Sequence, residues 1–390
     1  MHKLRNLLIL TASYGDGHLQ VSRVLQQKFE KYGFPGVRVI DLFEEAHPLM
    51  NKVTRFLYMN SGALSAYGLD YYGWSYYMTR NLRRESLLAR CLNALGIQKL
   101  MNVIMQEQPD LLISTFPFGG ISDQLKRRGI LIPTCTILTD FVLHNRWIYS
   151  MPDRFFVATE QLRQSMVERG VPEQIITVSG IPIRDTFYMT ESVTTGEPQH
   201  SILIMAGAYG VLRDMKKITE QLLELPDVRI NVVCGKNQRL QSELEASFAG
   251  ESRLHLHGFV DHIHELMNAS SCVITKAGGI TLSEAIHVNV PIVVFKPFPG
   301  QEKENAGFLS DQGVAFIANE IPELVRYVEI VLNDEGLRSQ VREKASALQA
   351  SYASERIVQD VLRMLPARAL PQGWQGRSAL ELVDGGLHGT

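Results

Sequence analysis

The sequence predicts an α/β protein made of two Rossmann-like domains that face a ligand cleft, and three observations lead to this. Short runs of apolar residues alternate with amphipathic stretches through most of the 390 residues. The series starts again near residue 202, after a polar segment, and the first run of each series leads into a glycine-containing turn. Apolar runs of strand length separated by helical patterns are typical of parallel sheets that helices cover on both faces. At about 150 residues per domain, the length also fits two or three domains.

The first series predicts the N-terminal domain. Its expected strands lie at residues 7–11, 37–40, 111–114, 134–138 and 154–158. Helical patterns separate most of these strands, as at 21–32 and 162–169.

The second series predicts the C-terminal domain. Its expected strands lie at residues 202–205, 230–234, 254–256, 272–275 and 292–295, and a helical region follows at 320–365. The division that we expect is a first Rossmann-like domain at 1–188, a polar linker at 189–200, a second Rossmann-like domain at 201–350, a C-terminal helix at 351–365 and a flexible tail at 366–390. The C-terminal helix is expected to pack back on the N-terminal domain.

Composition excludes several classes of protein. A hydrophobic fraction of 45% and a charged fraction of 21% are those of a globular chain. The net charge of −2 divides into +5 for residues 1–190 and −7 for 191–390, and a chain so near neutrality is not expected to bind nucleic acid. No apolar run approaches the roughly 18 residues of a membrane span, and the first run is too short for a signal peptide. The four cysteines form no CxxC, which argues against zinc and disulfides. We therefore expect a cytosolic protein, or one attached peripherally to the cytoplasmic face of the membrane.

Each domain opens with a strand that runs into a glycine turn. The turn at 15–18 reads Gly-Asp-Gly-His and the turn at 207–210 reads Gly-Ala-Tyr-Gly, and each precedes a helical pattern. Small residues such as Gly17 and Gly207 let the backbone approach a ligand at a helix N-terminus. Neither turn is a GxGxxG and no P-loop is present, so each turn is also explained as a tight connection without a ligand. His18, at the edge where α/β sheets bind ligands, is either a proton acceptor or a helix residue without chemistry.

A dense motif, TKAGGITLSEA, occupies residues 275–285. Its glycines and helix start can hold a diphosphate while Glu284 binds both hydroxyls of a ribose. Alternatively, Thr281 and Glu284 form a capping arrangement at the start of the helix. The next loop, PGQEKENA at 299–306, is rich in polar side chains that suit the hydroxyls of a sugar, although it could also be a solvated turn.

These segments resemble the nucleotide-sugar site of the lipid glycosyltransferases that include plant monogalactosyldiacylglycerol synthase and the peptidoglycan N-acetylglucosaminyltransferase, and they are most similar to the bacterial diacylglycerol glucosyltransferases. Further matching segments are LILTASYGDGH at the start, ILTDFVLHNRW at 137–147, VSGIPIR at 178–184, IMAGAYGVL at 204–212 and VVCGKN at 232–237.

The resemblance implies the GT-B fold, a UDP-sugar in the C-terminal domain, a lipid acceptor in the N-terminal domain, and inversion at the anomeric carbon. Carried over residue by residue, it implies diphosphate contacts at Gly278, Gly279 and Thr281, ribose binding by Glu284, hexose contacts at Gln301, Glu302 and Asn305, and uracil contacts at Phe259 and Val260. Asp16 departs from the Gly or Asn of many relatives.

The expected reaction is a single displacement in which UDP-glucose glucosylates the hydroxyl of diacylglycerol. Successive transfers would give mono-, di- and higher glucosyldiacylglycerol. Asp-x-Asp, the motif that holds a metal in the other common architecture, does not occur in the chain, so no metal or other cofactor is expected. We prefer His18 as the base that removes the hydroxyl proton. Asp140 is the second candidate, and a helix or turn cap is its alternative.

Residues 56–90 combine six of the 13 tyrosines with Trp74 and four arginines. Aromatic rings beside clustered arginines are typical of a segment at a membrane interface, although core helices also contain aromatics. The residues expected to contact acceptor and anionic membrane are Gly17, Tyr71, Tyr72, Trp74, Arg80, Arg83 and Arg84.

Three other functions stay open. A galactosyltransferase that uses UDP-galactose would differ only in the hexose. A UDP-sugar epimerase can share the fold but gives no reason for the segment of tyrosines and arginines. A catalytically silent UDP-sugar sensor at the membrane is the third.

Overall fold

The computed structural model describes residues 6–12, 16–34, 36–46, 76–78, 80, 97–189, 200–207, 212 and 214–365. They form two compact units. The N-terminal unit contains the described residues up to 183 together with those from 350 onward, and the C-terminal unit contains residues 184–349. The expected linker lies mostly outside the described residues, and the expected tail at 366–390 lies wholly outside them.

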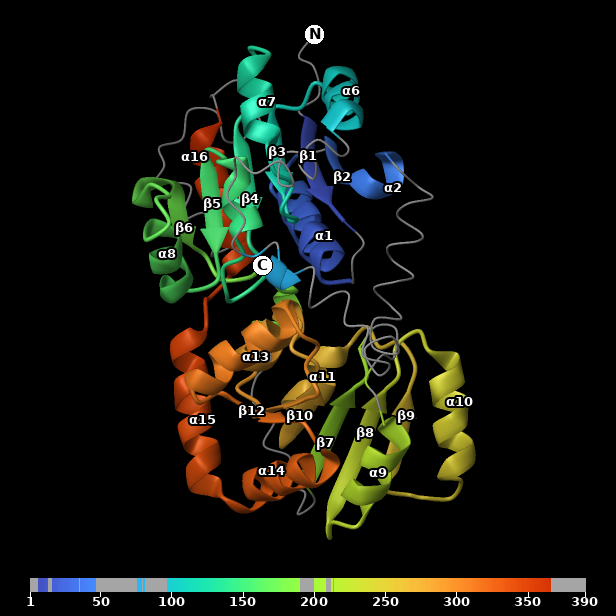
Figure 1. Ribbon diagram of the computed structural model, residues 1–390. Helices are drawn as coiled ribbons and strands as arrows, with labels where there is room; N and C mark the ends of the chain where they lie inside the picture. The colour runs from blue at the N-terminus through green and yellow to red at the C-terminus, as the bar shows by residue number, and fades with distance from the viewer. Residues whose placement is uncertain are drawn as a thin grey trace. The chain divides into compact units, whose positions relative to one another are not determined.

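The N-terminal unit is built on a parallel sheet of order β2-β1-β3-β4-β5-β6 (Figure 1). Its strands are β1 (Asn6–Thr11), β2 (Gly36–Asp41), β3 (Leu111–Ser114), β4 (Thr134–Ile137), β5 (Arg154–Val157) and β6 (Ile176–Val178). Its helices are α1 (Asp16–Lys31), α2 (Leu42–Ala46), α6 (Ile97–Glu107), α7 (Ile121–Arg127), α8 (Glu160–Val167) and α16 (Ala353–Met364), with the short 3-10 helices η1 (Asn145–Ser150) and η2 (Glu173–Ile175).

Both faces of this sheet are apolar. Leu8 and Leu10 of β1 share a buried cluster with Leu100 of α6 and Leu125 of α7. The alternate side chains Leu7 and Ile9 are equally buried and point to the opposite face, because side chains of a strand alternate. Burial on both faces explains why these strands are uninterrupted apolar runs.

The C-terminal unit repeats this plan with the order β12-β11-β10-β7-β8-β9 (Figure 1). Its strands are β7 (His200–Met205), β8 (Val228–Val233), β9 (Leu254–His257), β10 (Cys272–Thr275), β11 (Ile292–Phe295) and β12 (Ala315–Ala318). Its helices are η3 (Asp185–Phe187), α9 (Met215–Leu223), α10 (Gln238–Ser247), α11 (Ile263–Asn268), α12 (Gly279–His287), α13 (Gln301–Asp311), α14 (Ile321–Asn333) and α15 (Glu335–Leu348).

Each sheet therefore has one strand more than the apolar runs predict. The added strands, β6 and β12, lie at the sheet edges and each has two half-buried positions. Strand β6 is only three residues long and contains Thr177, whereas β12 is a short apolar run, Ala315–Ala318, that the expected strands did not include. In addition, α1 begins at Asp16, five residues before the expected helix at 21–32. The first turn of α1 is polar, so the apolar periodicity did not reveal it.

Helix α16 returns to the N-terminal unit, as the sequence analysis expected. It packs on α1, where Lys28 Nζ lies 3.4 Å from Glu355 Oε2. Thr177 of β6 donates a hydrogen bond to Asp360 at 2.9 Å. The apolar face of α16 is buried, so the last described helix completes the first unit.

Among the described helices, none has the length and apolar character needed to cross a membrane.

Candidate functional site

His18 lies where the strand order of the N-terminal sheet reverses direction. Strand β1 has β2 on one side and β3 on the other, and α/β proteins bind ligands beyond the carboxyl ends of such a pair. The ring of His18, in the first turn of α1, is buried at this edge. Its Nδ1 lies 2.7 Å from the backbone oxygen of Thr115, the residue after β3.

The partner of Nδ1 fixes the tautomer of His18. A carbonyl oxygen only accepts hydrogen bonds, so Nδ1 carries the proton and Nε2 keeps a lone pair. Thr139, near the end of β4, places its Oγ1 3.1 Å from the same Nδ1, and Phe116 meets the ring edge-on. Burial lowers the pKa of His18 to about 4. The ring is therefore neutral at pH 7, and its Nε2 can accept a proton.

A buried group of hydroxyls supports this histidine. Ser22 Oγ donates to the backbone oxygen of His18 at 2.9 Å and lies 2.9 Å from Thr115 Oγ1. Thr115 Oγ1 in turn lies 3.2 Å from Thr11 Oγ1 at the end of β1. These contacts tie the start of α1 to the ends of β1 and β3, which holds the imidazole in one orientation.

Asp140 follows Thr139 directly and is also buried. The structure therefore places this carboxyl one residue from the threonine that contacts His18. Its role as a second candidate base stays a prediction.

The described part of the expected acceptor and membrane residues is small. Gly17 is half-buried in the first turn of α1. The ring of Tyr76 meets the ring of His144 edge-on, and the backbone oxygen of Tyr76 accepts a hydrogen bond from His144 Nε2. Burial lowers the pKa of His144 to about 4, and the charges of Arg146 and Arg80 lower it further. Next to Tyr76, the side chains of Tyr77 and Met78 are exposed. The remaining predicted residues, Tyr71, Tyr72, Trp74, Arg83 and Arg84, lie outside the described residues.

The predicted donor glycines lie where the order of the C-terminal sheet reverses, between β7 and β10. The predicted uracil residues follow β9 at the sheet edge, and the predicted hexose residues follow β11. Gly207 follows β7 with a φ of 83°, a conformation that favours glycine. Gly278 and Gly279 follow β10. Gly278 has an ordinary φ of −71°, and a Cβ built there would meet nothing within 4 Å. Neither backbone nor packing requires glycine at 278, and the open space beside it suits the close approach of a ligand.

The N-terminus of α12 can receive an anion. Gly278 is its N-cap and provides no side-chain hydrogen bond, so the first N–H groups are left without a side-chain cap. Thr281 lies inside the first turn and not at the N-cap, so the alternative expectation that Thr281 and Glu284 cap the helix is wrong. Amides and helix dipole together favour a phosphate at this point.

Lys276 lies beside both glycine turns. Its Cδ is 3.9 Å from the position that a Cβ on Gly207 would take. Its Nζ lies 4.1 Å from the centroid of the Phe298 ring and 3.7 Å from Glu302 Oε1. A cation is thus held at the place where the diphosphate is expected.

The first turn of α13 carries the residues predicted for the hexose. The turn follows Gly300, whose φ of 98° requires glycine, and Gln301 is the first helical residue. Glu302 Oε2 accepts from the backbone N–H of Phe298 at 3.3 Å. Asn305 is 0% exposed and donates to the backbone oxygen of Ala277 at 3.4 Å. Glu302 and Asn305 therefore join this turn to the glycine turn of α12, and their contacts with a hexose stay predictions.

Glu284 lies in α12 with a residue exposure of 3%. Arg184 Nη2 lies 3.2 Å from Glu284 Oε1. The same guanidinium donates to the backbone oxygen of Asp261, directly after the predicted uracil residues Phe259 and Val260. Phe259 is 61% exposed, so its ring is accessible to a base.

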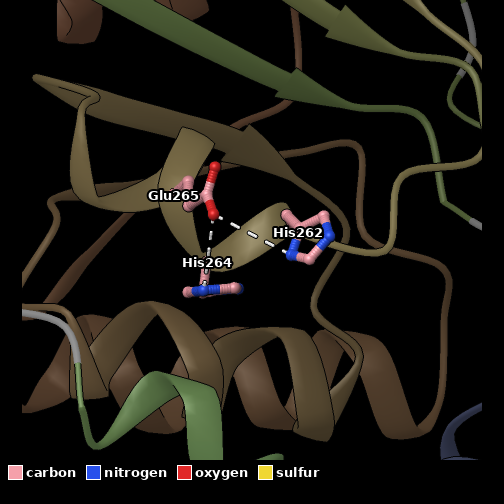
Figure 2. A group of neighbouring side chains, drawn as sticks. All are labelled: His262, His264 and Glu265. Carbon is pink, nitrogen blue, oxygen red and sulfur yellow. Dashed lines mark ion pairs between the residues drawn. The ribbon is translucent and has the colours of Figure 1, made fainter.

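His262, His264 and Glu265, which follow Asp261 in the chain, form a group of possible metal ligands (Figure 2). Glu265 Oε1 stands 3.8 Å from His262 Nδ1 and 4.0 Å from His264 Nε2. The side chains of His262 and Glu265 are 74% and 68% exposed. The side chain of His264 is 12% exposed, and burial lowers its pKa, which disfavours a charged ring beside Glu265. The predicted donor residues are not part of this group.

Sequence reasoning missed three residues of these sites: Thr115, Lys276 and Arg184. Lys276 stands inside the TKAGG segment, and Arg184 ends the VSGIPIR segment, so the family motifs contained a signal for both. Thr115 gave a weaker signal, its position directly after a buried strand.

Comparison with known proteins identifies the family. Residues 18–183 match the monogalactosyldiacylglycerol (MGDG) synthase family, and residues 200–347 match the glycosyl transferases group 1 family. A protein of Bacillus licheniformis named processive diacylglycerol beta-glucosyltransferase is 37% identical over 372 residues, which cover 93% of this chain and 96% of that protein. The chain belongs to the processive diacylglycerol β-glucosyltransferase family. The Bacillus subtilis protein of the same name is 36% identical over 375 residues, with the same coverage.

Solved structures agree with this family in fold. Acinetobacter baumannii MurG superposes with a TM-score of 0.62 at 16% identity, covering 92% of this chain and 100% of MurG. Staphylococcus aureus MnaA, solved with UDP, gives 0.59 at 16% identity, covering 92% of this chain and 96% of MnaA. Together with the two parallel six-stranded sheets, these likenesses confirm the predicted fold of two Rossmann-like domains. The resemblance stated from the motifs is confirmed as well.

Proposed function

We propose that this protein transfers glucose from UDP-glucose to the hydroxyl of diacylglycerol, with inversion, and that it adds further glucose units in succession to make membrane glycolipids. The observation that carries the proposal is the similarity to processive diacylglycerol β-glucosyltransferases, which runs through both units and covers 93% of the chain. A match confined to one unit would support only half of such a reaction.

The C-terminal unit supplies a place for the donor. The open space at Gly278, the uncapped start of α12 and the Lys276 ammonium suit a diphosphate. The buried Glu284 carboxylate suits the two hydroxyls of a ribose, and the exposed Phe259 suits the base. The departing UDP gains negative charge, which amides, helix dipole and ammonium can stabilise without a metal ion.

The N-terminal unit supplies a base. The acceptor hydroxyl gives its proton to His18 Nε2 as its oxygen forms a bond to the anomeric carbon. The bond from that carbon to the UDP oxygen breaks in the same step, so one displacement inverts the configuration. The bond from Nδ1 to the Thr115 oxygen orients the ring and stabilises the imidazolium that forms.

Transfer assays test the donor and the acceptor together. The purified chain is incubated with dioleoylglycerol and labelled UDP-glucose or UDP-galactose, with and without EDTA, and the lipids are resolved. We expect glucolipids of increasing size, equally with EDTA. Glu284→Ala should abolish most product, whereas Glu243→Ala, on the exposed face of α10, should not. A chain that makes no glycolipid from either donor contradicts the proposal.

Galactose is the one alternative donor with an observation in its favour, because residues 18–183 match the MGDG synthase family. The UDP-galactose arm of the same assay decides between the two hexoses.

The protein is also proposed to act as a peripheral enzyme on the cytoplasmic face of an anionic membrane. Arg80, Arg83 and Arg84 each add about 1 kcal/mol of attraction to such a surface. Sedimentation with phosphatidylglycerol vesicles should weaken in high salt, and it should weaken on joint replacement of these three arginines by Gln. Replacing Arg239, Arg338 and Arg342 of the other unit is the control of equal charge. Equal sedimentation of both triple variants and the parent chain would contradict the membrane contact.

A further inference from the structure

Glu284 has a partner that the donor-site motif does not contain. Its carboxylate is buried in α12, and leaving such a charge unpaired in the interior would cost several kcal/mol. Arg184 meets it with Nη2 at 3.2 Å from Oε1. Arg184 lies 100 positions earlier in the sequence, so only the fold brings the two together.

The same guanidinium holds a second segment. Its Nη1 donates to the backbone oxygen of Asp261 at 2.9 Å, directly after Phe259 and Val260. The guanidinium carbon Cζ lies 5.2 Å from the centroid of the Phe187 ring, a cation–π contact that helps to hold the guanidinium in place. The planar fork of arginine can make both contacts at fixed geometry, whereas the single ammonium of a lysine cannot.

We propose that Arg184 is a positioning residue of the donor site, which aims the Glu284 carboxylate at a ribose and fixes the backbone segment that receives the base. This rests on the proposed function only for the assignment of Glu284 to the ribose. A carboxylate has acceptor sites for a guanidinium and for two hydroxyls at once, so the ion pair is compatible with ribose binding.

The test compares two ligands that differ only in the ribose. Calorimetry on the full chain measures the affinity for UDP and for 2′,3′-dideoxy-UDP, without any turnover. We expect the parent chain to prefer UDP, by about 10- to 100-fold for hydrogen bonds to a charged group. Arg184→Ala, Arg184→Lys and Glu284→Gln should each bring this ratio close to one, mainly by weakening UDP. The double variant Arg184→Ala/Glu284→Gln should have the same affinity ratio between UDP and 2′,3′-dideoxy-UDP as each single variant.

Arg253 provides the matched control. It pairs with Glu251 and donates to the backbone oxygens of Leu223 and Leu225, which are contacts of the same kind outside the donor residues. Arg253→Ala should lower the melting temperature and leave the UDP preference unchanged.

Two outcomes would overturn the proposal. One is an Arg184→Lys variant that keeps the parental preference for UDP. The other is an Arg184→Ala variant that keeps the parental ratio between the two ligands, since loosening the base segment alone weakens UDP and 2′,3′-dideoxy-UDP by the same factor and leaves Glu284 aimed at the ribose. Failure of glucosyl transfer is a separate result, since a chain that shows the expected ratios but makes no glucolipid contradicts only the proposed function.

Discussion

At the scale of single residues, the environment of His18 decides what its imidazole can do. Sequence position placed it after a glycine turn, but the Thr115 oxygen selects the tautomer and burial lowers the pKa to about 4. A histidine with its ordinary pKa would be partly charged near pH 6.5 and unable to act as a base in that fraction. The buried ring keeps its lone pair through the neutral range.

Replacing this base should separate chemistry from donor binding. His18→Ala is expected to lower kcat by about 10²- to 10⁴-fold, because the proton of the acceptor hydroxyl loses its acceptor. The affinity for UDP should be unchanged, and calorimetry on the same sample checks it. His255→Ala, an exposed histidine of β9, should leave both quantities at the parental values.

The activity should also depend on pH in a particular way. His18 must be neutral to accept a proton, and with its pKa lowered to about 4 it stays neutral down to mildly acidic pH. We expect kcat/KM to stay level from pH 8 to about pH 5 and to fall only as pH approaches 4. A profile that already falls through pH 6.5 would contradict the assignment of His18 as the base.

At the scale of elements, the turns after β7, β10 and β11 differ in what they require of glycine. Gly207 and Gly300 have positive φ values of 83° and 98° and serve the backbone. Gly278 has neither a positive φ nor a neighbour that a Cβ would meet. A glycine that the fold does not need, at an uncapped helix start, is best explained by a ligand.

This difference predicts opposite effects for two glycine substitutions. Gly278→Ala should change the free energy of unfolding by less than about 1 kcal/mol, because the conformation is ordinary and the space is open. It should weaken UDP binding, because the methyl group enters the space proposed for the diphosphate. Calorimetry and urea unfolding measure the two effects.

Gly180→Ala is the contrasting variant. Gly180 has a φ of 82°, and its Cβ would lie 2.3 Å from Ala350 Cβ. It should therefore unfold at markedly lower urea. If Gly278→Ala behaves like Gly180→Ala, or binds UDP normally, the assignment of this turn to the donor is wrong.

At the scale of the whole molecule, the described residues pass from the first unit to the second after residue 183 and return to the first at residue 350. Helix α16 closes the N-terminal unit although the intervening 184–349 segment forms the other unit. Ile357 and Leu362 of this helix are buried there. The stability of the first unit therefore depends on residues from the end of the described chain.

A buried substitution in α16 tests this dependence. Leu362→Ala should cost about 2–5 kcal/mol, the usual range for such a truncation in a packed core. Hydrogen exchange should speed up in β4, β5 and β6 more than in the strands of the C-terminal unit. Arg356→Ala, on the exposed side of the helix, should stay within about 0.5 kcal/mol of the parent. Faster exchange confined to β7–β12 would contradict the placement of α16.

The fold class, the central strands and the positions of the glycine turns can be read from the amino-acid sequence alone. These features are local, because a strand buried on both faces must be apolar and a turn at a helix start needs small residues. The charge division of +5 and −7 also came from the sequence alone, as did the motifs that point to the family.

Which side chains become partners follows from the folded arrangement of the strands and helices. The edge strand β6 is too short, at three residues, to stand out in the sequence, and β12 was recognised as a strand only from its pairing with β11. Thr115 lies 97 positions from His18, and Arg184 lies 100 positions from Glu284. No periodicity joins residues so far apart, since the order of strands in a sheet sets which chain ends become neighbours. The tautomer of His18 and the pairing of the buried Glu284 therefore follow from that order.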